Sequence, residues 1–173
     1  MKFADFLLQM QKREGIKSPQ SLIFDWSPKE IAIIEKRLNL VFKNSSGKKI
    51  KSASIKGQSN QSKGSAIEKY ICEELVKHNN GSLDFMKAGK SGYPDGKFIR
   101  GKSNVLYCVE IKATSNWDAS DSNRRVLLSS SSKLRALHES INFGKLKHLI
   151  LTCIYDSSNS QIKMFRIDFI DSK

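Results

Sequence analysis

The chain is predicted to have an α/β fold of the α+β kind, with a central mixed β-sheet of about five strands, flanking helices and an N-terminal helical segment. Two patterns predict this fold. Apolar residues recur at helical spacing in the first third of the chain, whereas short apolar runs bounded by turn residues dominate the second half. The length of 173 residues suits one compact domain with a full hydrophobic core.

Residues 1–43 are predicted to be a helical segment. Apolar residues recur at helical spacing from Phe3 to Met10. A second helix begins at Ser27-Pro28-Lys29-Glu30, a capping box with proline at the first helical position, and its apolar face includes Ile34 and Leu38.

A large excess of positive charge indicates the class of partner. The chain has 30 Lys plus Arg against 17 Asp plus Glu, a net charge of +13. Such an excess indicates a nucleic acid first and a membrane surface second. No apolar run approaches the roughly 20 residues that span a bilayer, and the N-terminus does not resemble a secretory signal. We therefore expect a soluble protein with no membrane partner, in the cytoplasm of a prokaryote and associated with the nucleoid.

Residues 44–64 differ in composition from their surroundings. From Lys43 to Gly64, both included, the chain has six lysines and no acidic residue, among many Ser, Asn and Gly residues. This composition predicts a basic polar linker or mobile arm. Two interpretations stay open: the lysines contact the backbone of a nucleic acid, or the segment is a solvated linker.

Residues 65–173 are predicted to form the core of the domain. A helix is expected from about Ser65 to His78, and strands are expected at 82–87, 93–99, 104–113, 148–156 and 161–169. A further helix near 131–143 separates the third strand from the fourth. The order of elements after residue 64 is therefore α-β-β-β-α-β-β.

Charged residues at the end of one apolar strand indicate a functional site. The run from Val105 to Val109 is typical of a buried strand, yet Glu110 and Lys112 follow it on one face. Charges set into an apolar strand cost several kcal/mol unless they are paired or bound to a metal. If Asp95 approaches from the neighbouring strand, two carboxylates share a small space, and a divalent cation relieves their repulsion. This pattern predicts a magnesium site.

The combination of Pro94-Asp95 and Glu110-Ile111-Lys112 resembles the PD-(D/E)xK nuclease superfamily, which includes most type II restriction endonucleases. The resemblance covers about residues 65 to 170 if the order of elements is included. It implies a restriction-endonuclease-like core in which Asp95, Glu110 and the backbone carbonyl of Ile111 bind Mg²⁺, for which Mn²⁺ would substitute. It also implies that Lys112 contacts the scissile phosphate and the attacking water, either as a base or as an orienting group.

Two further sets of residues are candidates. Many members of that superfamily have a carboxylate on the helix before the first strand, and Glu68 matches this position as a possible metal ligand, with Glu73 and Glu74 as competitors. Polar and basic residues near the motif are candidates for DNA contacts: Lys90, Ser91, Asn116, Arg124, Arg125 and Lys133.

The cysteines and histidines are assigned to structure. Cys72, Cys108 and Cys153 are widely spaced in apolar surroundings, as expected for reduced core thiols. The three histidines lack the spacing of metal ligands, so we interpret them as surface or core residues: His78, His138 and His148.

Three functions remain open at this point. The first is a Mg²⁺-dependent type II restriction endonuclease that cuts double-stranded DNA as a homodimer, or with a separate recognition subunit. The second is a structure-specific nuclease, such as a Holliday-junction resolvase or a repair enzyme. The third is a non-catalytic DNA-binding protein whose carboxylates are structural.

Overall fold

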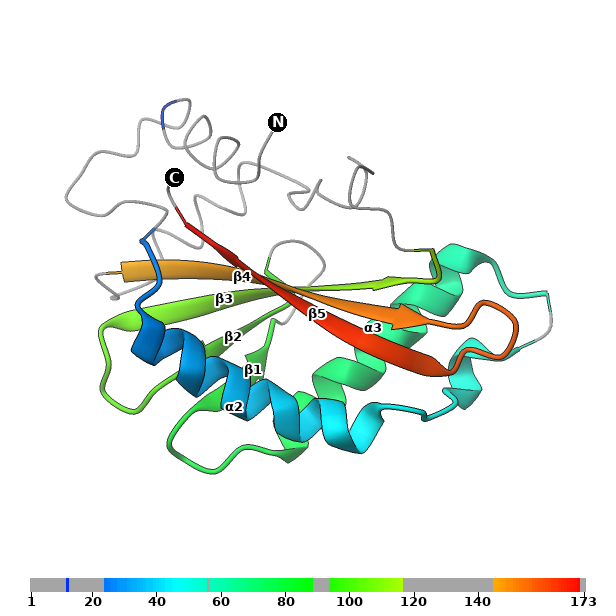
Figure 1. Ribbon diagram of the computed structural model, residues 1–173, viewed down its shortest axis with the longest axis horizontal. Coiled ribbons are helices and arrows are strands. Elements are labelled where there is room, and N and C mark those ends of the chain that lie inside the picture. Colours follow the sequence, from blue (N-terminus) through cyan, green and yellow to red (C-terminus); the bar gives the residue numbers. More distant parts are fainter. Residues whose placement is uncertain (1–11, 13–23, 56, 89–93, 117–144, 172–173) are drawn as a thin grey trace.

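The computed structural model describes residues 12, 24–55, 57–88, 94–116 and 145–171, which form a mixed five-stranded β-sheet with two α-helices (Figure 1). The predicted α+β class is confirmed. The expected helices near residues 3–10 and 131–143 lie outside the described residues.

The sheet has its strands in chain order. The strands are β1 (Asp84–Lys87), β2 (Gly96–Ile99), β3 (Val105–Thr114), β4 (Lys145–Tyr155) and β5 (Ile162–Ile170). β3 pairs with β4 in parallel, and the other neighbours are antiparallel. Because parallel neighbours end at the same edge, Thr114 of β3 lies beside Ile154 of β4.

Two helices and a short 3-10 turn accompany the sheet. Helix α2 (Pro28–Ser45) begins with the predicted capping box, in which Ser27 and Glu30 bond each other's backbone N–H groups. Helix α3 (Asn60–Lys77) begins about five residues earlier than expected, because the side chain of Ser59 caps its first turn. The 3-10 turn η1 spans Lys51–Ala53.

Both helices contribute to one hydrophobic core against one face of the sheet. The strand residues in this core alternate along β3 and β4, as expected for a single buried face. The core includes Ile34, Leu38 and Val41 of α2, Ile67, Ile71 and Leu75 of α3, and Phe85, Phe98, Val109, Ile111, Leu149 and Leu151 of the strands. The intervening residues of β3, among them Cys108 and Glu110, point to the opposite face.

A buried ion pair holds the start of α2 against the sheet. The ammonium of Lys147 on β4 lies 2.5 Å from Oε2 of Glu30 and donates to the backbone carbonyl of Asp25. The indole N–H of Trp26 donates to the backbone carbonyl of His148 (3.0 Å). These contacts place the beginning of the helix over β4.

The lysine-rich segment before α3, for which a linker or arm was expected, is hydrogen-bonded to the turn between β4 and β5. Lys49 forms a β-bridge with Gln161. The hydroxyl of Ser160 donates to the carbonyl of Ala53 (2.5 Å), and the hydroxyl of Ser54 donates to the carbonyl of Asn159 (3.1 Å). The segment therefore has a defined course along the sheet.

Cysteine and histidine positions agree with the structural interpretation where they are described. Cys72, Cys108 and Cys153 are buried free thiols. His148 is buried in β4, whereas His78 is half-buried at the end of α3 and its Nδ1 hydrogen-bonds the carbonyl of Glu74. No helix within the described ranges is long and apolar enough to cross a membrane.

Candidate active site

The strand pairing brings Asp95 opposite Glu110. β2 and β3 are antiparallel, with Gly96 opposite Val109, so the next residues outward are Asp95 and Glu110. Opposed residues of an antiparallel pair point to the same face of the sheet. Asp95 and Glu110 are therefore neighbours across the β2–β3 pair.

Gly96 permits this arrangement. A Cβ atom on Gly96 would lie 2.1 Å from Cζ of Phe85, a ring that is almost fully buried in the core. Only glycine lets that ring lie across β2 immediately after Asp95. The Pro94-Asp95-Gly96 sequence is typical of a turn, and nothing in it predicts this packing role of Gly96.

Asp95 is held by the backbone of β3. The N–H of Ile111 donates to Oδ2 of Asp95 at 2.7 Å. A charged acceptor strengthens such a bond and fixes the carboxylate beside the strand. This contact also places the backbone of Ile111, whose carbonyl is a candidate metal ligand, next to the Asp95 carboxylate.

Glu110 is the most buried carboxylate of the site. Its side chain is 5% exposed, and its Oε1 lies 2.6 Å from the ammonium of Lys112, which is 34% exposed. Its other oxygen, Oε2, is buried and has no hydrogen-bond partner among the described residues. An unsatisfied buried carboxylate oxygen costs free energy, so it calls for a ligand or a proton.

Burial and neighbouring charge shift the protonation of this pair. Burial, with smaller effects from the carboxylates of Asp95 and Glu68, raises the pKa of Glu110 to about 8, although Lys112 opposes the shift. Burial disfavours the charged form of Lys112, but the surrounding carboxylates outweigh it and raise the pKa of its ammonium. The lysine therefore remains charged.

Glu68 reaches the site from α3. Its Oε1 accepts from the backbone N–H of Ala113 at 3.2 Å, and burial raises its pKa. Its two competitors point elsewhere: Glu74 pairs with Lys77 at 2.7 Å, and Glu73 is exposed on another side of the helix. Of the three carboxylates, Glu68 is the one that the structure brings to the end of β3.

The set of possible metal ligands is small. In the described part of the chain, no three His, Cys, Asp or Glu side chains lie close enough together to hold a metal ion by themselves. Asp95 and Glu110 supply two carboxylates, and a backbone carbonyl and water would have to complete a shell for a hard divalent cation.

Of the predicted DNA contacts, the structure describes Asn116. It is exposed just beyond β3, where the hydroxyl of Thr114 donates to its carbonyl (2.9 Å). The others lie outside the described residues: Lys90, Ser91, Arg124, Arg125 and Lys133.

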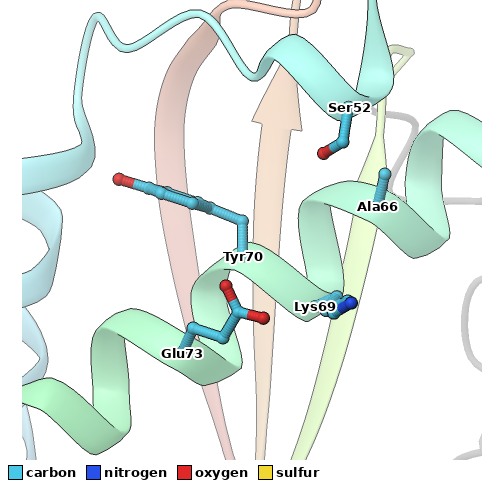
Figure 2. Close-up of a pocket in the computed structure, with 5 residues that line it drawn as sticks. All are labelled: Ser52, Ala66, Lys69, Tyr70 and Glu73. Carbon is cyan, nitrogen blue, oxygen red and sulfur yellow. The ribbon is translucent and has the colours of Figure 1, made fainter.

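A separate hollow lies between η1 and α3. It has a volume of about 360 Å³ and is lined by Ser52, Ala66, Lys69, Tyr70 and Glu73. Figure 2 shows the last four along one side of α3, with Ser52 facing them. The ammonium of Lys48 lies 5.9 Å from the centre of the Tyr70 ring. This hollow does not contain the carboxylates of the candidate site.

No family model and no curated protein matches this chain. A proposal about its function therefore rests on the site and on the charge of the chain.

Proposed function

We propose that this protein is a Mg²⁺-dependent endonuclease of the PD-(D/E)xK type that hydrolyses phosphodiester bonds in double-stranded DNA, with a restriction-endonuclease-like core. The arrangement of Glu110 is the main support. It is a buried carboxylate with one oxygen that has no hydrogen-bond partner among the described residues, it faces Asp95 across neighbouring strands, and it has Lys112 beside it. A purely structural ion pair does not account for that oxygen.

The donor atoms suit magnesium. The carboxylates of Asp95 and Glu110 and the carbonyl of Ile111 are hard oxygen ligands, and Oε2 of Glu110 has no other partner in the part of the chain that the structure describes. Glu68 is a further candidate, either as a ligand or through water. When bound, the cation would act as a Lewis acid toward the phosphate and would lower the pKa of a coordinated water.

Lys112 supplies the positive charge of the site. Its ammonium is partly exposed at the end of the strand and is held by Glu110. A substrate phosphate at this edge would meet the ammonium, which would stabilise negative charge that develops on the phosphorus oxygens. Because neighbouring carboxylates keep it protonated, we assign Lys112 the role of orienting and stabilising group rather than base.

The net charge of +13 suits a DNA substrate. Site-specific cleavage as a type II restriction endonuclease is the narrower form of this proposal. A symmetric recognition sequence would require a homodimer with one active site for each strand, or a separate recognition subunit. We also propose that the protein is located in the prokaryotic cytoplasm, in association with the nucleoid.

Incubation with supercoiled plasmid and Mg²⁺ tests the proposal. The wild-type protein is expected to nick or linearise the plasmid, and Glu110→Gln is expected to abolish this activity. Glu35→Gln is a matched control, since Glu35 is an exposed glutamate on α2, and it is expected to retain full activity. Activity in Glu110→Gln, or no cleavage with either Mg²⁺ or Mn²⁺, would refute the assignment.

The products separate the narrower alternatives. Discrete fragments from a long plasmid support a restriction endonuclease. Cleavage confined to branched substrates supports a structure-specific nuclease. Binding without cleavage supports a DNA-binding protein with structural carboxylates.

A further inference from the structure

Four lysines project from a part of the chain that is fixed at one end of the sheet. Lys48, Lys49 and Lys51 are exposed, and the partly exposed Lys63 donates from Nζ to the carbonyl of Ser157 (3.1 Å). No acidic residue occurs between positions 43 and 67. We refer to Lys48, Lys49, Lys51 and Lys63 as the lysine shelf.

Backbone hydrogen bonds determine the position of the shelf. The N–H of Gly47 donates to the carbonyl of Ile162 (2.9 Å), and the N–H of Ile162 donates to the carbonyl of Lys48 (2.9 Å). The N–H of Ile50 donates to the carbonyl of Ser160 (3.1 Å). Since none of these bonds involves a lysine side chain, the ammonium groups of Lys48, Lys49 and Lys51 are available for a partner while their backbone stays in place.

The lysine shelf lies at the same end of the sheet as the candidate active site. β3 and β4 end together, with Thr114 beside Ile154, and the shelf is bonded to the turn that follows β4. A Cβ on Gly64, in the first turns of α3, would lie 3.6 Å from the carbonyl oxygen of Ala113. Figure 1 shows the ends of β3 and β4, the β4–β5 turn and the start of α3 gathered at one end of the molecule.

The hollow of Figure 2 opens within this surface. Lys48 lies over Tyr70 at one side of it, and Lys69 and Ser52 are on its lining. The phenolic oxygen of Tyr70 is buried and has no hydrogen-bond partner among the described residues. Because the lining of the hollow is mostly apolar and includes the carboxylate of Glu73, we assign phosphate contacts to the lysine shelf and not to the hollow.

We infer that the lysine shelf binds the phosphate backbone of duplex DNA alongside the scissile phosphodiester. This inference rests on the proposed nuclease function and deepens it by naming the surface that holds the substrate. Because the backbone that carries these lysines is already held in place, their ammonium groups displace condensed counterions from the DNA without the entropy cost of ordering a flexible arm. The contact is independent of base sequence, so it positions the duplex rather than selecting a site.

The test compares two triple variants with the same loss of charge. The shelf variant and the control variant each replace three exposed lysines with alanine. Alanine keeps the backbone N–H and carbonyl groups, so the backbone hydrogen bonds are expected to remain. The shelf variant is Lys48→Ala/Lys49→Ala/Lys51→Ala, and the control is Lys29→Ala/Lys36→Ala/Lys102→Ala. Binding to a fluorescent 30-base-pair duplex of arbitrary sequence is measured by anisotropy between 50 and 200 mM salt, in EDTA to prevent cleavage.

The shelf variant is expected to bind at least about tenfold more weakly at 100 mM salt. Its log–log salt dependence should be shallower by about 2 to 3, at about 0.9 for each lost phosphate contact. The control is expected to show a much smaller change in slope. Equal changes in the two variants, or wild-type binding by the shelf variant, would overturn the inference, as would shelf-dependent binding to anionic phospholipid vesicles without binding to duplex.

The outcomes for the shelf and for the nuclease are separable. If the wild-type protein does not cleave DNA but the shelf variant loses duplex binding, the nuclease proposal fails and the DNA-binding surface stands. If the protein cleaves DNA and the salt dependence of the shelf variant is unchanged, the shelf inference fails alone. Thermal unfolding of both variants verifies that they are folded.

Discussion

Glu110→Gln is expected to stabilise the metal-free protein in a pH-dependent manner. The Glu110 carboxyl has an ordinary pKa of 4.5, and burial raises its pKa to about 8 in the folded protein. Between pH 4.5 and about 8, the Glu110 carboxyl is therefore protonated in the folded protein and ionised in the unfolded protein. Stability from this group is fully present below pH 4.5 and is lost as pH rises towards 8.

The size of the effect follows from the two pKa values. At about 1.4 kcal/mol for each pKa unit, ionised Glu110 costs at most about 5 kcal/mol at pH 8. Glutamine has the same shape and no charge to desolvate, but it leaves Lys112 without its counter-ion. Because Lys112 is 34% exposed and can be solvated by water, this loss is small. We expect a net gain of roughly 2–3 kcal/mol at pH 8 and almost none at pH 5.

Urea unfolding in EDTA at pH 5, 6, 7 and 8 measures this difference. The free energy of unfolding of the wild-type protein should fall relative to that of the variant as pH rises. Parallel curves for the two proteins over this range would refute the argument. In a second series with Mg²⁺ at pH 8, the wild-type protein should gain stability and Glu110→Gln should not, because ligand binding to the folded state adds to its stability.

Three other substitutions have defined expectations. Lys112→Ala is expected to abolish plasmid cleavage and to leave duplex binding intact, as measured by gel and by anisotropy, because both carboxylates remain. Gly96→Ala is expected to lower the free energy of unfolding by roughly 1–3 kcal/mol in urea titrations, because the new methyl group meets the buried ring of Phe85. Lys147→Met is expected to cost about 3 kcal/mol at pH 7, because it leaves the carboxylate of Glu30 without its buried partner. Although burial works in the opposite direction, hydrogen bonds from Lys147 and Ser27 lower the pKa of Glu30 to about 2. The wild-type protein should therefore lose stability as pH falls from 4.5 towards 2, and Lys147→Met should lose much less in that range.

Controls accompany these expectations. Gly64→Ala places its new methyl group at an ordinary contact distance of 3.6 Å in a helix, so it should be neutral or stabilising by up to about 1 kcal/mol. The double variant Glu30→Gln/Lys147→Met should be more stable than Lys147→Met. Wild-type turnover by Lys112→Ala, a stable Gly96→Ala protein or an additive double variant would each contradict the corresponding reasoning.

Local sequence patterns predicted much of the framework. The capping box at Ser27 located the start of α2 to the residue, and the apolar run from Val105 located β3. The opposition of Asp95 and Glu110 followed from two strands that are joined by a polar turn and pair as neighbours. These features are predictable because each depends on residues that are near one another in the chain.

Long-range contacts explain what the sequence did not reveal. The segment expected to be a linker is held by bonds such as that from Ser160 to Ala53, whose partners are 107 positions apart. The pair of Lys147 and Glu30 is separated by 117 positions. A polar composition indicates that a segment is exposed to solvent. It does not indicate which of the segment's backbone groups form hydrogen bonds with a distant turn.

The three buried cysteines are protected from alkylation while the protein is folded. Burial raises the pKa of the Cys108 and Cys153 thiols to about 12, and that of Cys72 to about 11. Alkylating reagents require an accessible thiolate, so these sites react only when the surrounding structure opens. Mass spectrometry of labelled peptides can therefore report the opening of α3, β3 and β4 separately, without an added probe.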